Sequence, residues 1–245
     1  MHRVLCTLGV LLLLALKTGP VSASELRLAL GGWDYDLSGQ YNDSLRDRDL
    51  ERDLAVRPRD QGSVSLDYEW RDGRPDLAAA FVQIGARGRS QENVPVGIGP
   101  VPIGSASTTL DSVGDFTDLE FSARWPLSRG ALRFSPGLVL KHLGGEIQVF
   151  EDGVEVSRQD VDVWFPQPLA RLDWKPSRYV RINTSAQGIA YDGDHAVEWQ
   201  ASAELALGVL LVQAGWQEKS YRVHDDDSEL DVQLRGPVFR VGLSF

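Results

Sequence analysis

The sequence has almost no sulfur, no excess of positive charge and, after its first residues, no long apolar run. Among 245 residues there is one cysteine, Cys6, and one methionine, Met1. Cys6 lies in an N-terminal stretch that we expect to be removed, so the mature chain would lack thiols. That excludes disulfide scaffolds, thiolate-zinc sites and cysteine nucleophiles. With 25 basic and 35 acidic side chains, the chain also lacks the basic face that nucleic-acid binding needs.

The only long apolar run lies at the N-terminus. It extends over Val4–Leu16, which is shorter than the roughly 20 residues that a membrane-spanning helix requires. Small residues up to Ala23 follow it and suit a cleavage position. We therefore predict a cleaved secretory signal peptide over residues 1–23 and a mature chain, residues 24–245, that works outside the cytoplasm.

Alternation of apolar and polar residues runs through most of the mature chain, whereas helical periodicity is almost absent. Between Asp118 and Trp125, for example, polar and apolar residues follow one another with a period of two, which is the signature of a β-strand. The pattern predicts an all-β fold. The expected strands are 25–37, 62–71, 76–89, 115–125, 131–149, 156–174, 178–191, 196–207, 210–222 and 229–245.

The connections between these strands are of two kinds. Tight turns follow Trp70, Trp125 and Trp174, whereas the alternate connections are longer or more acidic, the longest being 38–61 and 90–114. Outer-membrane barrels have short turns at one end and long loops at the other. The three tryptophans would form an aromatic girdle at a membrane interface. We predict an antiparallel transmembrane β-barrel of ten strands, with eight or twelve strands as alternatives.

The chain ends on an apolar strand. Phe239, Val241, Leu243 and Phe245 alternate up to a terminal phenylalanine. A closing strand of this kind is typical of the signal that outer-membrane assembly machinery recognises. Together with the signal peptide, it predicts a protein of the Gram-negative cell outer membrane.

Two strands change the parity of their apolar positions. Even positions are apolar before the pairs Gly31-Gly32 and Gly236-Pro237, and odd positions are apolar after them. One extra residue in a strand would move its side chains to the opposite face, and proline cannot donate to a ladder. Gly31, Gly32, Gly236 and Pro237 are therefore predicted strand bulges.

These features resemble a family of Gram-negative outer-membrane β-barrel proteins of about this length. The family has a Gly-Gly motif in the first strand and a closing Gly-Pro…Phe strand. The matching segments are Leu28–Trp33, Val161–Leu169 and Arg235–Phe245. The resemblance extends along most of the mature chain and is weak in the loops. It implies a barrel in the outer membrane and brings no catalytic residues.

Chemistry-bearing side chains are few, and we predict no catalytic site, no metal site and no cofactor. Histidine and aspartate gather at two predicted hairpin tips, where they are also ordinary turn residues. The residues that could contribute to catalysis are His195, Asp192, Asp194 and His224, and those that could contribute oxygen ligands to a cation are Asp225, Asp226 and Asp227.

Ten strands enclose a narrow lumen, because barrels of about eight strands are filled by side chains and porins need about 16. The inward positions carry both signs of charge, which predicts a plugged lumen. We expect a structural or interaction role, without enzymatic activity, for a monomer. Its partners would be outer-membrane lipid, lipopolysaccharide and the assembly machinery, with no nucleic acid. The alternatives are a surface hydrolase, omptin-like or lipid A-modifying, and a narrow channel for small solutes.

Overall fold

The computed structural model describes residues 25–43, 47–51, 55–70, 74–98, 101–128, 130–191, 193–225 and 228–245. Within this part of the chain no helix is long and apolar enough to cross a membrane. The described residues form one antiparallel sheet. Its strands are β1 (Glu25–Trp33), β2 (Asp36–Asp43), β3 (Asp47–Asp49), β4 (Arg57–Glu69), β5 (Asp76–Ile98), β6 (Val101–Arg124), β7 (Leu132–Glu151), β8 (Val154–Trp174), β9 (Val180–Tyr191), β10 (Asp194–Leu207), β11 (Leu210–Asp225) and β12 (Ser228–Ser244).

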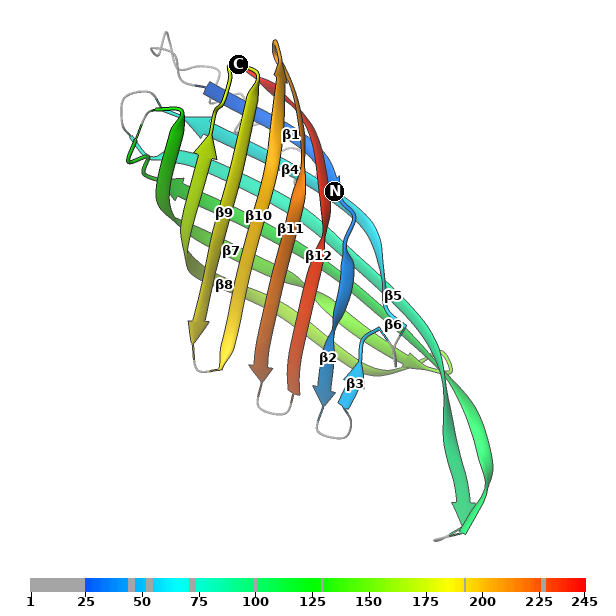
Figure 1. Cartoon of the computed structure of the whole chain (residues 1–245). Helices are drawn as coiled ribbons and strands as arrows, with labels where there is room; N and C mark the ends of the chain where they lie inside the picture. The colour runs from blue at the N-terminus through cyan, green and yellow to red at the C-terminus, as the bar shows by residue number, and fades with distance from the viewer. Residues whose placement is uncertain are drawn as a thin grey trace.

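The sheet closes on itself as a barrel of ten strands (Figure 1). Both β1 and β2 pair with β12. β1 pairs with residues 238–244 of β12, and β2 pairs with residues 228–235. They are therefore two halves of one barrel strand, and β3 is a short addition to the edge of β2. The predicted strand number is confirmed. We call the end that holds the C-terminus and the turns after Trp125 and Trp174 the inner end, and the opposite end the outer end.

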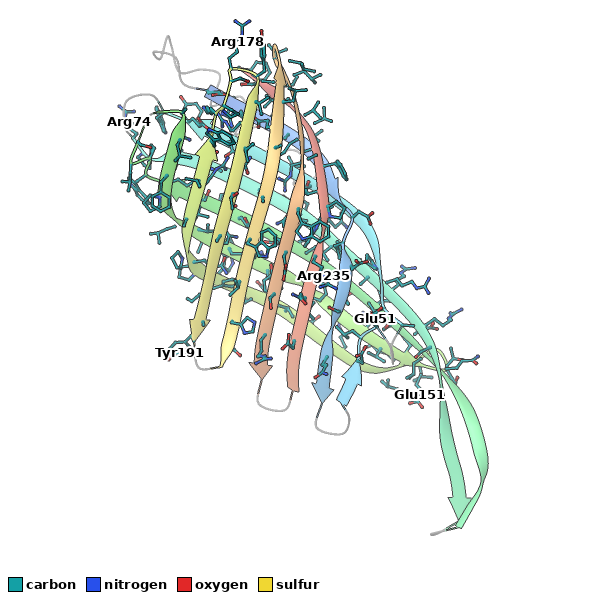
Figure 2. The ribbon with its side chains drawn as sticks, in the orientation of Figure 1. Glu51, Arg74, Glu151, Arg178, Tyr191 and Arg235 are labelled. Atoms are coloured by element: carbon teal, nitrogen blue, oxygen red, sulfur yellow. The ribbon has the colours of Figure 1, made fainter. Side chains whose placement is uncertain are left out.

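Every second side chain along each strand points outward, and the side chains on this outer surface are largely apolar. Leu30, Phe121, Leu138, Leu172 and Val241 are exposed on this surface. Figure 2 shows side chains projecting from both faces of the strands. The terminal residues Phe239, Val241, Leu243 and Phe245 are all exposed there as well. The apolar exterior is that of a membrane-spanning barrel.

Tryptophans bracket this apolar surface. Trp125 and Trp174 are exposed at the inner end, and Trp70 is half-buried there beside Arg74, which lies 4.9 Å from its ring. Toward the outer end Trp164 is exposed on the same face of β8 as Trp174. These two residues enclose about ten residues of strand, the length of a tilted transmembrane strand.

The four predicted bulges are absent. β1 pairs with β12 through Gly31 and Gly32 without a change of register, and β11 pairs with β12 through Gly236 and Pro237 in the same way. The prediction was wrong because the parity change has another cause. The residues that are apolar after Gly32 point into the lumen. The polarity of the lumen therefore changes at this height, whereas the register of the strand does not.

Two predicted loops are partly strand. Residues 90–98 and 101–114 continue β5 and β6 as a paired ribbon that projects beyond the barrel (Figure 1). Within 38–61, the segments 38–43, 47–49 and 57–61 lie in β2, β3 and β4. The alternation in both regions is too weak to have predicted strands, and pairing with a neighbouring strand decides the conformation.

The outer part of the barrel separates into two leaves. β9 to β12 with β2 form one leaf and β4 to β8 form the other, and their outer ends point in different directions (Figure 1). The β8–β9 ladder extends only from Trp174 to Leu169. On the opposite side β4 pairs with β1 up to Ser63, and the described residues of β4 and β2 share no ladder. The lumen is therefore wider at the outer end.

Candidate functional site

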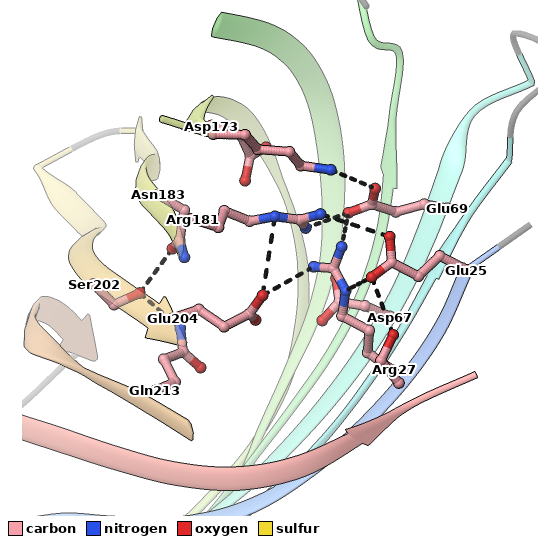
Figure 3. A network of polar contacts seen from close by, with 12 residues as sticks. Glu25, Arg27, Asp67, Glu69, Asp173, Arg181, Asn183, Ser202, Glu204 and Gln213 are labelled. Atoms are coloured by element: carbon pink, nitrogen blue, oxygen red, sulfur yellow. Dashed lines mark hydrogen bonds and ion pairs between the residues drawn. The ribbon is translucent and has the colours of Figure 1, made fainter. Parts of the chain in front are cut away.

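Arginines and carboxylates from eight strands lie in the inner half of the lumen, and Figure 3 shows part of this network. Glu69 lies at the centre and accepts hydrogen bonds or ion pairs from Arg27 at 3.0 Å and Arg181 at 2.7 Å. Arg133 bridges Glu69 at 3.4 Å and Asp76 at 3.0 Å. The arginine cluster consists of Arg27, Arg124, Arg133, Arg171 and Arg181 with Glu25, Asp67, Glu69, Asp76, Asp173 and Glu204.

A second group of charges lies farther toward the outer end. The lysine cluster consists of Lys141 and Lys219 with Asp118, Glu120 and Glu198. The Lys141 ammonium lies 2.9 Å from Asp118 and 2.7 Å from Glu120, and Lys219 lies 3.0 Å from Glu198. Both lysines are fully buried. A buried charge is stable only when it is paired in this way.

The three acids of the lysine cluster bring their oxygens within 4.8 Å of one another, as a cation site would. The ammonium groups of Lys141 and Lys219 already lie among these oxygens. The positive charge that the acids need is thus supplied by the chain, and the group is an ion-pair cluster in place of a metal site. The alternation in the sequence places Asp118, Glu120, Lys141 and Glu198 on inward faces, but it neither groups them nor includes Lys219.

An apolar layer separates the lysine cluster from the outer part of the lumen. Trp33 and Tyr35 are buried together, with ring centroids 4.9 Å apart, and pack with Val82 and Val238. The indole of Trp33 donates to the Gly236 carbonyl at 3.2 Å, and the Tyr35 hydroxyl donates to the Gly85 carbonyl of β5 at 3.0 Å. These bonds satisfy the polar atoms of both rings.

Above this layer lies a cavity of about 460 Å³, which we call the outer cavity. Both leaves contribute apolar side chains to it. The lining includes Leu37, Leu50, Ile189, Ala196, Val232 and Leu234 from one leaf and Ile84, Ala86, Phe116, Leu143, Val163 and Phe165 from the other. A largely apolar concave site of this size is the usual form of a small-molecule site.

The sequence carries a sign of the outer cavity in two of its strands. In the strand that contains Trp33 and Tyr35, and in the one that contains Val232 and Leu234, inward positions change from polar to apolar partway along. The sequence-based prediction explains this change by bulges. A change in the polarity of the lumen gives the same pattern in both strands, because their inward faces meet at the same height.

Of the predicted catalytic residues, Asp194 and His195 both line the outer cavity. His195 lies 3.2 Å from the Ser220 hydroxyl, on β10 and β11. His142, which the prediction did not include, lies 2.7 Å from Asp162 and stacks on Trp164, on β7 and β8.

Several predicted positions lie outside the described residues. Asp192, Asp226 and Asp227 do so entirely, as do the side chains of His224 and Asp225. The cation hypothesis for Asp225, Asp226 and Asp227 therefore remains a sequence-based prediction.

Comparison with known proteins places the fold among outer-membrane barrels. The chain is similar to the outer membrane protease OmpT from Escherichia coli, with 8% identity, a TM-score of 0.50, and coverage of 94% of this chain and 99% of that one. It is also similar to the translocator domain of the autotransporter NalP from Neisseria meningitidis, with 10% identity, a TM-score of 0.39, and coverage of 100% and 95%. Ail from Yersinia pestis, in complex with the heparin analogue sucrose octasulfate, matches at 11% identity and a TM-score of 0.39, with coverage of 89% and 98%.

No family model matches the sequence, and no curated protein matches it. At identities this low the structural likeness concerns the fold alone.

Proposed function

We propose that this protein is an outer-membrane β-barrel that binds a small apolar molecule in its outer cavity and closes its lumen beneath that site. The observation that carries the proposal is the order of layers along the barrel axis. An apolar cavity lies above the layer of Trp33 and Tyr35, and the lysine cluster and the arginine cluster lie in the lumen below that layer. A ligand can be held at this place without a path to the inner end.

The size of the outer cavity sets the size of the ligand. An apolar cavity of about 150 Å³ binds benzene, and the outer cavity is roughly three times as large at about 460 Å³. Burial of apolar surface stabilises binding by about 25 cal/mol per Å². We expect molecules of about three aromatic rings, or acyl chains of similar volume, to fit.

The surroundings of the barrel follow from its exterior. The tryptophans at both ends of the apolar surface support a position across the outer membrane, with Trp70, Trp125 and Trp174 as the inner girdle and the outer end toward lipopolysaccharide. The exposed closing strand through Phe245 supports assembly by the outer-membrane machinery. We propose that the barrel acts as a monomer after residues 1–23 are removed.

The two alternative functions have less support. A channel needs a continuous water path, which the buried pairs of Lys141 and Lys219 oppose. A hydrolase needs a nucleophile, a base and an orienting acid in one site. The pairs His195–Ser220 and His142–Asp162 lie on different strand pairs.

Binding of phenylnaphthylamine tests the proposed function. The refolded barrel in detergent is titrated with this neutral three-ring fluorophore, and we expect a saturable component of one site per barrel above the linear partitioning into detergent. Ala86→Phe should remove that component, because its ring would occupy the cavity that Ala86 lines. The matched control is Ala186→Phe, since Ala186 is exposed on the outward face of β9. Equal binding by both variants, or none by the unaltered chain, would contradict the proposal.

Planar-bilayer recordings test the closed lumen. The inserted barrel should show no stable open state, because two successive clusters of paired charges fill the narrow lumen. Heat-modifiable gel mobility of the same sample verifies that it contains the folded barrel. A large and stable conductance from folded protein would refute the plugged lumen.

A further inference from the structure

The ladder between β8 and β9 ends partway up the barrel wall. Leu169 and Gln187 form its last pair toward the outer end. From there β8 continues along β7 to Val154, and β9 continues along β10 to Tyr191. In the described parts of the two strands no further rung joins them. Unpaired strand edges are costly in a membrane unless they border a cavity or another polar environment, so this gap in the wall requires a cause.

Two prolines account for the end of the ladder. The amide of Lys175 donates to the Ala131 carbonyl, on the β7 side of the strand. The N–H groups of a strand alternate between its two sides, so the even-numbered residues of β8 direct theirs toward β9. Pro168 and Pro166 are the next even positions after the last hydrogen-bonded rungs, and proline has no N–H to donate.

The outer cavity reaches this gap from inside. Val163 and Phe165 line the cavity from the β8 side, and Ile189 and Tyr191 line it from the β9 side. Val163 is 40% exposed and Tyr191 is 80% exposed, although both lie on the inward faces of their strands. The cavity therefore opens sideways between β8 and β9.

The gap on the opposite side of the barrel is different. There Leu50 is buried against Leu110, and Val56 packs beside it. The Val56 amide donates to the Leu50 carbonyl at 2.8 Å. These side chains cover that side of the cavity, so the opening lies at β8 and β9.

The opening lies at the level of the outer membrane surface. Trp164 is adjacent to Val163 on β8, points outward beside His142, and is the exposed tryptophan that marks the outer end of the apolar surface on this strand. We infer that the gap bounded by Val163 and Tyr191 is a side portal, through which the outer cavity exchanges apolar molecules with the outer leaflet of the membrane. The ligand class is then acyl chains and apolar compounds dissolved in that leaflet. This inference rests on the proposed function of the outer cavity.

Photolabelling from the bilayer tests the portal. The full barrel is reconstituted in phosphatidylcholine vesicles that contain a phospholipid with a photoactivatable group near the end of one acyl chain, and labelled residues are identified by mass spectrometry. We expect labels on the inward residues Phe165 and Ile189 as well as on outward residues such as Leu138. A lipid held by its headgroup in the leaflet reaches the inward residues only through the wall.

Two variants close the portal in different ways. Pro166→Val with Pro168→Val returns two donors toward β9 and should extend the ladder, and Pro136→Val on β7 is its control. Val163→Arg places a charge in the opening, and Val154→Arg, at an exposed tip position of the same strand, is its control. Each closing variant should lose the labels on Phe165 and Ile189 and keep the label on Leu138, while its control keeps all three.

The outcomes separate the portal from the proposed function. If phenylnaphthylamine binds but the acyl chain labels only outward residues, the portal is refuted. The cavity is then a binding site that is filled from the outer end of the barrel. Labels on inward residues that persist in both closing variants would refute it as well. If phenylnaphthylamine does not bind to the unaltered barrel, the proposed function itself fails.

Discussion

Replacement of Lys219 by methionine should destabilise the barrel by about 3–5 kcal/mol, which is the usual cost of removing one partner from a buried ion pair. The Lys219 side chain is fully buried and pairs with Asp118, Glu120 and Glu198. The lysine cluster holds three carboxylates and two ammonium groups, so its formal charge changes from −1 to −2 in the variant. The measurement is the free energy of unfolding in urea, followed by the heat-modifiable gel shift.

A compensating variant distinguishes charge from packing. Lys219→Met combined with Glu198→Gln returns the cluster to a formal charge of −1, and we expect it to recover a substantial part of the lost stability in a double-mutant cycle. Arg89→Met is the control on an exposed pair. Arg89 binds Asp111 at 2.5 Å and lowers the pKa of that carboxyl by its hydrogen bond, but both groups face solvent and the change should be small. Equal effects at Lys219 and Arg89 would contradict the plugged lumen.

Gly236→Ala should prevent normal closure of the barrel. A Cβ atom at this position would lie 2.0 Å from the carbonyl oxygen of Asp34 and 2.7 Å from the Cα of Tyr35. Both are backbone atoms of the β1–β2 connection, which cannot rotate away as a side chain would. The strands would have to separate by about 1 Å, with loss of the Trp33 bond to the Gly236 carbonyl and the Asp34 bond to the Pro237 carbonyl. We expect a loss of about 3 kcal/mol or more, at the upper end for overpacking.

The yield of the heat-modifiable folded form after refolding measures this effect. Gly62→Ala is the matched control, because a Cβ there would meet nothing within 4 Å. Substitution of glycine by alanine at a compatible position is neutral or slightly stabilising. A normal folded yield for Gly236→Ala would show that β12 does not approach β1 and β2 as closely as the structure places it.

The sequence by itself determined the fold class. Period-two alternation, tight turns after Trp125 and Trp174, and the closing strand through Phe245 are local features, and each constrains a strand or a turn directly. They were sufficient for a closed ten-strand barrel, with the outward and inward faces of most strands. They also placed Lys141, Glu198 and several other charges on inward faces, because parity along a strand is a property of the sequence.

Only the tertiary structure decided which inward residues meet. The lysine cluster joins Asp118, Lys141, Glu198 and Lys219 from four strands, and these contacts depend on barrel closure and strand register, which no single segment encodes. The same holds for the change of the lumen from charged to apolar near Trp33, which in one strand looks like a bulge. The side opening at Pro166 and Pro168 is an intermediate case, because the missing donors are visible in the sequence. Their consequence became apparent only when β9 was found on the side where those donors would have pointed.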